Sequence, residues 1–252
     1  MDPRRDRGEQ DLSDDTPALS VVIPVYNEGE NVAQTLRAVV EKTSTRPLEV
    51  LVVYDFDEDT TVPVVKRLQT ELPALRLYKN TLGRGVINAM KSGLRAARGP
   101  YVLITMGDGS DEAADIDPMY RLARAGADVV AGSRYMRGGR QEGGPVLKRT
   151  MSRMASLSLH WFGGLPVHDA TSNFRLYSKR LLNQVTIESR GGFELGLELT
   201  VKAYRLGMRV DEVPTTWRDR TAGQSRFKLW QWLPRYLHWY WRGMAGRLGI
   251  SR

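Results

Sequence analysis

The chain has 252 residues, of which 41% are hydrophobic and 26% charged, and its formal net charge is +8. This length suits one large or two small packed domains, and the basic charge favours acidic partners such as phosphates, nucleotides, anionic lipids or nucleic acids. The absence of cysteine excludes disulfides and thiolate metal sites, and the three histidines are not spaced as a zinc pair.

Residues 1–17 are mostly charged and lack apolar periodicity, which predicts a disordered tail. After them, short β-branched runs alternate with helical patterns, which is typical of an α/β protein with a doubly wound, mostly parallel sheet flanked by helices. The predicted strands are 19–25, 48–54, 75–78, 101–105, 128–132, 173–177 and 209–214. Helical patterns include 86–97, 146–162 and 193–206, and Asp117-Pro118 is a favourable start for another helix.

Two segments depart from this alternation. Residues 137–145 are rich in glycine and predict a flexible lid or linker. Residues 227–248 interleave four tryptophans with lysine and arginine, which suits either the headgroup boundary of a membrane or packing on the domain. Pro234 is expected to interrupt any single helical face there. We therefore expect a tail over 1–17, a domain over 18–226 and an amphipathic, membrane-interfacial helical tail over 227–252.

No run of about 18 uncharged apolar residues predicts a membrane span, and no signal peptide is recognisable. A cytoplasmic location is therefore the default expectation.

Acidic side chains follow three of the predicted strands. Glu28 comes after the first strand, Asp55 after the second and Asp108 after the fourth. These strands are expected neighbours, so their carboxyl ends should open into one crevice, which is where open α/β sheets bind ligands. Carboxylates in such a crevice can hold Mg²⁺ or Mn²⁺, and the cation can bridge phosphate oxygens.

The sequence also disfavours two other nucleotide sites. No G-x-G-x-x-G follows the first strand, and the chain contains no phosphate-binding loop of the form G-x-x-x-x-G-K-[ST]. Each carboxylate taken singly is more often a simple loop cap. The coincidence of three such exits points instead to a nucleotide diphosphate held through a metal.

The run Val22-Ile23-Pro24-Val25-Tyr26-Asn27-Glu28 resembles the opening motif of inverting family-2 glycosyltransferases with the GT-A fold. More specifically, residues from about 19 to 230 are similar to dolichol-phosphate (polyprenyl-phosphate) mannose synthases. The further matching elements, in the family's order, are the acidic loop after the second strand, 83–89, Asp108, 132–135, 173–177, 212–214, and Asp219-Arg220 with Gly223 and Ser225.

The resemblance implies roles for particular positions. The positions expected to bind the donor nucleotide are Pro24, Tyr26, Glu28, Val53, Asp55 and Gly107. Arg134, Arg220 and Arg226 match basic positions that hold donor or lipid phosphates, and Arg220 is assigned to catalysis together with Asp108.

Three departures from the family pattern bear on these roles. Met106 stands where the family has the first Asp of its metal motif, Tyr54 replaces the first Asp of an Asp-Asp pair, and Arg226 replaces the usual Lys. Asp111 is our candidate for a second metal ligand beside Asp108. Weaker metal binding, a different donor and loss of activity are the open consequences.

The implied activity is transfer of a hexose, with mannose from GDP-mannose favoured, to a polyprenyl or dolichyl phosphate at the cytoplasmic face of a membrane. Two alternatives stay open. The first is a family-2 enzyme that uses a UDP-sugar or a hydroxyl acceptor, which needs a general base such as Asp169, Glu194 or Glu198. The second is an inactive nucleotide-sugar-binding homologue. Nucleic-acid binding is disfavoured, because no recognisable module accompanies the basic charge.

Overall fold

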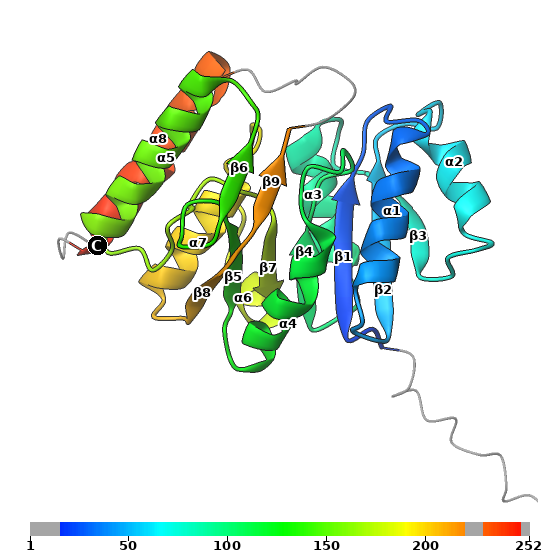
Figure 1. Cartoon of the computed structure of the whole chain (residues 1–252), viewed down its shortest axis with the longest axis horizontal. Coiled ribbons are helices and arrows are strands. Elements are labelled where there is room, and N and C mark those ends of the chain that lie inside the picture. The colour runs from blue at the N-terminus through cyan, green and yellow to red at the C-terminus, as the bar shows by residue number, and fades with distance from the viewer. Residues whose placement is uncertain (1–15, 220–228, 248–252) are drawn as a thin grey trace, which may run out of the picture.

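A computed structural model describes residues 16–219 and 229–247 of the chain (Figure 1). The predicted disordered tail over 1–17 lies almost entirely outside these ranges, as do Arg220 and Arg226.

A seven-stranded sheet forms the centre of the molecule, in the order β3-β2-β1-β4-β7-β5-β8. All of its strands run parallel except β7, which is antiparallel to β4 and to β5, so the predicted mostly parallel sheet is confirmed. The strand bounds are β1 Leu19–Pro24, β2 Leu48–Tyr54, β3 Leu75–Lys79, β4 Tyr101–Ile104, β5 Val129–Ser133, β7 Arg175–Ser178 and β8 Val210–Pro214.

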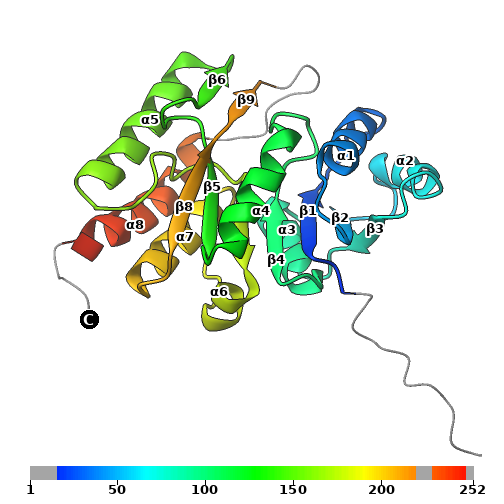
Figure 2. The same cartoon turned by 60° about the horizontal axis from the view of Figure 1, so that its bottom comes forward.

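Helices cover both faces of this sheet (Figures 1 and 2). The helix bounds are α1 Asn31–Lys42, α2 Thr61–Leu68, α3 Val86–Ala96, α4 Ile116–Arg124, α5 Val146–Trp161, α6 Lys179–Gln184, α7 Leu195–Arg205 and α8 Leu229–Arg247, with a 3-10 turn η1 at Ala113–Asp115. The α/β alternation expected from the sequence is thus present along the chain.

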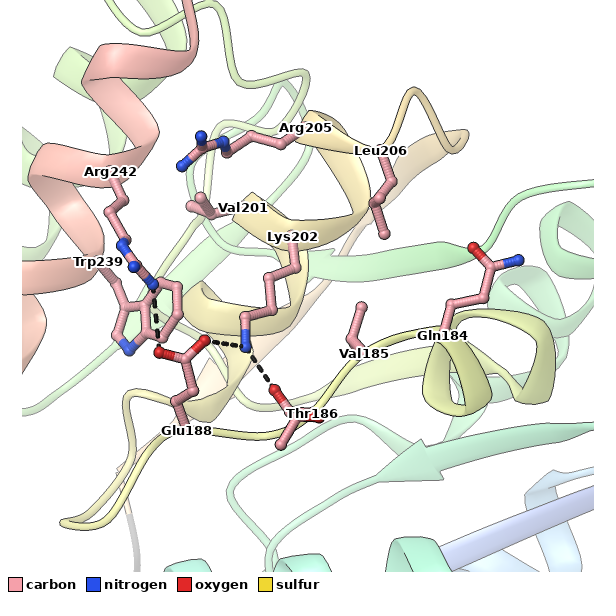
Figure 3. Close-up of a pocket in the computed structure, with 10 residues that line it drawn as sticks. All are labelled: Gln184, Val185, Thr186, Glu188, Val201, Lys202, Arg205, Leu206, Trp239 and Arg242. Atoms are coloured by element: carbon pink, nitrogen blue, oxygen red, sulfur yellow. Dashed lines mark hydrogen bonds and ion pairs between the residues drawn. The ribbon is translucent and has the colours of Figure 1, made fainter. Parts of the chain in front are cut away.

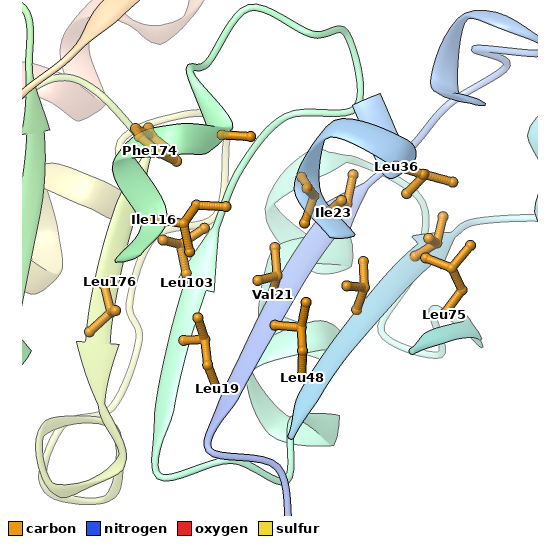
Figure 4. Close-up of a cluster of buried hydrophobic side chains, with 14 of the residues drawn as sticks. Leu19, Val21, Ile23, Leu36, Leu48, Leu75, Leu103, Ile116, Phe174 and Leu176 are labelled. Atoms are coloured by element: carbon orange, nitrogen blue, oxygen red, sulfur yellow. The ribbon is translucent and has the colours of Figure 1, made fainter. Parts of the chain in front are cut away.

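Each face of the sheet carries its own apolar cluster, because successive side chains of a strand point to opposite faces. On β1, Val21 and Ile23 pack with α1, α2 and α4, as Figure 4 shows for part of that cluster. Val22 points the other way, toward α3, and belongs to a second cluster that also includes residues of α7 and α8. Both clusters are fully buried at β1, which makes this strand the centre of the core.

The glycine-rich segment contains a strand, contrary to the prediction of a flexible lid or linker. β6 (Arg140–Glu142) pairs in parallel with β9 (Thr216–Arg218) as a separate two-stranded sheet. The run Arg-Gln-Glu has no β-branched residue, and its partner lies far along the sequence, so no local pattern marks it.

Asp117 does not cap α4 as predicted. The helix begins at Ile116, with Asp115 as its N-cap residue. The Asp117 carboxylate instead accepts hydrogen bonds from the backbone N–H of Ser44 at 2.7 Å and of Thr45 at 3.1 Å. It therefore ties the loop after α1 to α4.

The last helix, α8, continues through Pro234, although this proline was expected to interrupt it. It packs against α5 and α7 at the end of the molecule opposite α2 (Figure 1). Trp239 is buried there, and the charged groups of Lys202 and Arg242 lie 4.9 and 5.0 Å from its ring centroid. Within 16–219 and 229–247, no helix combines the length and the apolar character that crossing a membrane requires.

Candidate active site

The three acidic strand exits lie at one edge of the sheet, as predicted. β1 is hydrogen-bonded to β2 on one side and to β4 on the other, and all three run parallel. Their carboxyl ends, Pro24, Tyr54 and Ile104, therefore sit side by side. The loops that carry Glu28, Asp55 and Asp108 begin within a few residues of these ends.

The first loop is a tight turn held by a buried carboxylate. Asn27 has a positive φ of 52°, and its backbone N–H donates to both oxygens of Asp59 at 3.0 and 3.1 Å. The backbone N–H of Glu28 donates to Thr61 Oγ1 at 3.0 Å. Asp59 thus fixes the conformation that presents Tyr26 and Glu28, a role that the sequence did not reveal because Asp59 is one of several acids in its loop.

Replacing Asp59 by Ala is expected to raise the donor KM about tenfold with a smaller change in kcat, because the turn loses charge-assisted hydrogen bonds. Steady-state kinetics with varied nucleotide sugar measures the effect. Asp57→Ala, in the same acidic loop but exposed and paired with Lys79, is the control. An unchanged donor KM in the Asp59 variant would contradict this role.

Aromatic and cationic groups line the same edge. The ring of Tyr26 is 40% exposed and meets Phe56 edge-to-face, with 5.5 Å between ring centroids. Phe56 also contacts Arg84, whose guanidinium lies over the Phe56 ring at 4.8 Å from the ring centroid. Pro24 and Val53 are buried, and the carbonyl of Val53 accepts a hydrogen bond from the backbone N–H of Val25 at 2.9 Å, so these two residues support the loops at this edge.

Asp55 shapes the neighbouring glycine loop. Its carboxylate accepts hydrogen bonds from Asn80 Nδ2 at 2.7 Å and from the backbone N–H of Gly85 at 2.8 Å. Asn80 also donates to the carbonyl of Gly83 at 2.7 Å. Gly85 has a φ of 125°, which favours glycine, and α3 starts at the next residue. Asp55 and Asn80 therefore set the position of Arg84.

The third loop carries a pair of carboxylates. Asp108 Oδ1 accepts from the backbone N–H of Ser110 at 3.1 Å. Asp111 Oδ2 accepts from Thr105 Oγ1 at 2.9 Å and from the backbone N–H of Met106 at 3.2 Å. Burial, together with the negative charge of Asp108, raises the pKa of Asp111 to about 6. The negative charge of Asp108 therefore disfavours ionisation of Asp111, and a cation between the two groups would relieve this repulsion.

Gly107 lies between these carboxylates and the core. Its carbonyl accepts a hydrogen bond from Thr35 Oγ1 at 3.2 Å, and a Cβ at this position would lie 3.1 Å from Val25 Cγ1. Thr35 belongs to α1, so the loop is anchored to the helix that follows the first strand. A side chain at 107 would push the loop away from β1.

Asp111→Asn is expected to stabilise the metal-free protein above pH 6 by roughly 1–3 kcal/mol. Folding raises the pKa of Asp111 from its usual 3.8 to about 6. The contribution of Asp111 to the free energy of unfolding is therefore complete below pH 3.8 and is lost as the pH rises through about 6. An asparagine oxygen can still accept both hydrogen bonds. Chemical denaturation at pH 4 and pH 8 measures this. A variant less stable than wild type at pH 8 would contradict the assignment.

The carboxylates of Asp108 and Asp111 suit a cation that is also bound by a diphosphate. In the described part of the chain, no group of three or more His, Asp or Glu side chains forms a metal cage. Mg²⁺ in nucleotide sites is typically held by one or two carboxylates, with phosphate oxygens and water completing the shell. Asp108 and Asp111 supply this number. Met106 instead packs against the apolar cluster on the α3 side of the sheet.

Arg134 is held by a buried carboxylate. Its Nε donates to Asp169 Oδ2 at 2.6 Å and its Nη2 to Oδ1 at 3.0 Å, with a third bond from Nη2 to Thr171 Oγ1 at 2.9 Å. Burial tends to raise the pKa of Asp169, but Arg134 outweighs it and holds that pKa below its usual value. The guanidinium is oriented by this pair, and its positive charge also acts on Asp111.

The three acids considered as general bases are each engaged. Asp169 is fully buried against Arg134. Glu194 accepts from the backbone N–H groups of Gly191 and Gly192 at 3.0 and 2.8 Å. Glu198 is buried and accepts from the N–H of Glu188 and Ser189 and from Lys202. These contacts give each of the three carboxylates hydrogen-bond partners within the fold.

The end of β9 lies beside the loop that carries Asp108. The backbone N–H of Arg218 donates to the carbonyl of Ser110 at 2.9 Å, and its guanidinium pairs with Glu112 at 2.9 Å. These contacts place Arg218 and Asp219 beside the candidate metal loop, immediately before Arg220 in the sequence. The predicted roles of Arg220 and Arg226 themselves lie outside the described residues.

A pocket of about 320 Å³ lies elsewhere, between α7, α8 and the segment after α6 (Figure 3). Glu188 sits in it between Lys202 at 2.7 Å and Arg242 at 3.3 Å. None of the predicted site residues lines it, and these ion pairs join α8 to the rest of the fold. The predicted site residues that the structure describes lie instead at or near the strand exits.

Comparisons with known proteins identify the family of this chain. The family model described as Glycosyl transferase family 2 matches residues 20–186. The polyprenol monophosphomannose synthase of Mycolicibacterium smegmatis is 29% identical over 255 residues, covering 94% of this chain and 91% of the relative. The undecaprenyl-phosphate mannosyltransferase of Micrococcus luteus is 30% identical over 243 residues, covering 91% of this chain and 98% of the relative.

A solved structure shows the same fold. The mannosyltransferase PcManGT from Pyrobaculum calidifontis, in complex with GDP-Man and Mn²⁺, superposes with a TM-score of 0.62 at 20% identity. The match covers 94% of this chain, which spans 66% of that structure's chain. The predicted GT-A architecture is thereby confirmed. With the family model and the curated relatives, these matches show that the chain belongs to glycosyltransferase family 2.

Proposed function

We propose that this glycosyltransferase moves mannose from GDP-mannose to a polyprenyl phosphate, with inversion, at the cytoplasmic surface of a membrane. The observation that carries the proposal is the meeting of the β1, β2 and β4 exits at one edge of the sheet. The names of the curated relatives support the sugar and the acceptor, and the solved structure holds GDP-Man.

Donor binding is assigned to the loops at this edge. The exposed ring of Tyr26 offers a face for the base, and Asp55 holds the glycine loop in place beside it. Asp108 and Asp111 would hold Mg²⁺ or Mn²⁺, which neutralises the charge that develops on the leaving diphosphate. Arg220 and Arg226 are proposed phosphate contacts, supported by the bond between Arg218 and Ser110 that lies just before them in sequence.

The acceptor is proposed to attack without a protein base. A phosphate oxygen forms the new bond to the anomeric carbon from the face opposite the diphosphate, while the bond from that carbon to the diphosphate breaks and GDP leaves. A phosphate monoester is already anionic near neutral pH, so it has no proton that must be removed. The engagement of Asp169, Glu194 and Glu198 favours this acceptor over a hydroxyl.

Incubation with labelled GDP-mannose, UDP-glucose or UDP-N-acetylglucosamine and a short polyprenyl phosphate tests the proposal. The expected product is a mannosyl phospholipid formed from GDP-mannose, with the anomeric configuration inverted relative to the donor. A parallel reaction with the corresponding polyprenol tests the hydroxyl alternative. Product from the alcohol but not from the phosphate would contradict the proposed acceptor, and product from a UDP-sugar alone would contradict the proposed donor.

A further inference from the structure

Exposed apolar side chains gather on one helix pair. Of the ten large hydrophobic side chains that are exposed within the described residues, five lie on α5 and its C-cap residue and two on α8. These seven are Val146, Leu147, Met154, Trp161, Phe162, Leu237 and Trp241. The two helices contact each other and lie together at the end of the molecule opposite α2 (Figures 1 and 2).

The inner face of α5 is polar and small. Ser152 hydrogen-bonds Thr171 at 2.6 Å, and Ser156 accepts from the backbone N–H of Ala170 at 3.2 Å. Leu159, three residues further along, is fully buried against α8, where a Cβ on Gly243 would come within 2.9 Å of it. These positions recur at helical spacing and define the side of α5 that packs on the domain.

The outer face of α5 is apolar. Leu147, Met154 and Trp161 follow one another at intervals of seven residues, which places them in one stripe on the side away from Ser156. Their side chains are 62%, 67% and 64% exposed. A helix with serines turned inward and an apolar stripe turned outward is the reverse of the usual arrangement in a water-soluble domain. The stripe therefore calls for an apolar partner.

α8 repeats this arrangement. Trp239 and Gly243, four residues apart, face the domain and are buried. Leu237 and Trp241, also four residues apart, are 42% and 63% exposed on another side of the helix. Tryptophan at the edge of an apolar surface is typical of the boundary between lipid headgroups and acyl chains.

The charge of the two helices identifies the partner. Neither α5 nor α8 contains an acidic residue, whereas α5 carries Lys148, Arg149 and Arg153 and α8 carries Arg235 and Arg242. Such a combination of an apolar stripe with basic flanks binds anionic lipid surfaces, because apolar burial and electrostatic attraction add. A second copy of this basic surface would instead meet it with like charge.

We propose that α5, together with α8, is the membrane-docking surface of this protein, and that its partner is an anionic lipid bilayer. The inference rests on the proposed function in one respect only, since that function requires a lipid-borne acceptor. It assigns the first contact with the membrane to α5, whereas the sequence analysis expected a membrane-interfacial segment only over 227–252. The stripe lies in the headgroup region parallel to the membrane plane.

Vesicle flotation tests the proposal with the full chain and vesicles of phosphatidylcholine, with and without phosphatidylglycerol. Wild type is expected to float with the anionic vesicles and less with the neutral ones. The triple variant Leu147→Glu, Met154→Glu, Trp161→Glu is expected to float at least about tenfold less. A control with the same charge change places glutamate at three exposed positions elsewhere, Thr70, Ala114 and Ala125, and should float as wild type does.

Three outcomes would overturn the proposal. The first is equal flotation of the triple variant and wild type, and the second is an equal loss of flotation in the control variant. The third is a wild type that binds no vesicles and sediments as a dimer, together with a triple variant that sediments as a monomer. Thermal unfolding of both variants verifies that they are folded. Sugar transfer to a water-soluble short-chain polyprenyl phosphate separates this inference from the proposed function. The triple variant should retain it, and its absence in wild type would count against the function and not against the docking surface.

Discussion

Replacing Asp108 by Asn is expected to lower kcat/KM for sugar transfer by about 10²- to 10³-fold while leaving the fold intact. The side chain lies in the loop that follows β4, and it is one of the two carboxylates proposed to hold the metal. Asparagine is nearly isosteric but carries no charge, so it cannot balance a divalent cation as aspartate does.

The measurement is initial-rate kinetics with GDP-mannose over a series of Mn²⁺ concentrations. Glu71→Gln is the control, because this carboxylate lies after the end of α2, is exposed, and forms a surface ion pair with Arg37. It should stay within about twofold of wild type, as expected for a surface ion pair. Full activity of the Asp108 variant, or an equal loss in the control, would refute the assignment of Asp108 to the metal.

Replacing Asp169 by Asn is expected to destabilise the protein by about 3–5 kcal/mol, because it leaves the buried guanidinium of Arg134 without its counter-ion. For a chain of this size the unfolding temperature should fall by on the order of 10 °C. The carboxylate is fully buried and receives bonds from Arg134, Thr171 and the backbone of Ser172. Differential scanning calorimetry measures the change.

A second variant shows whether the uncompensated charge is the cause. Combining Asp169→Asn with Arg134→Met removes both charges, so it should recover part of the lost stability. Additive losses in the double variant would mean that the two side chains stabilise the fold independently. An unchanged unfolding temperature in Asp169→Asn alone would show that this ion pair has no structural role.

The shared edge of the three acidic loops was predictable because two general rules apply to this sequence. β-branched runs such as 19–25 and 48–54 mark buried parallel strands, and the ligands of such sheets bind at the carboxyl ends. Glu28, Asp55 and Asp108 follow those ends directly, so their shared edge could be inferred before any coordinates. The placement of α3, α5 and α7 to within about two residues follows from equally clear apolar periodicity.

What the sequence could not reveal depends on contacts between distant residues. Asp59 is indistinguishable from Asp57 in the sequence, yet only Asp59 is buried under Asn27. Asp169 pairs with Arg134 across 35 positions, a contact that no local pattern in the sequence indicates. β6 forms only because β9 lies beside it. Helix α8 continues through Pro234, where the local rule predicts an interruption.

The central claim is that the exits of β1, β2 and β4 bind a sugar nucleotide through a cation at Asp108. Crystals grown with GDP and Mn²⁺, measured at the manganese absorption edge, test it most directly. We expect one anomalous peak about 2.0–2.2 Å from a carboxylate oxygen of Asp108, bridging to the diphosphate, with the base beside Tyr26. GDP bound with no manganese at Asp108, or bound away from this edge of the sheet, would contradict the account.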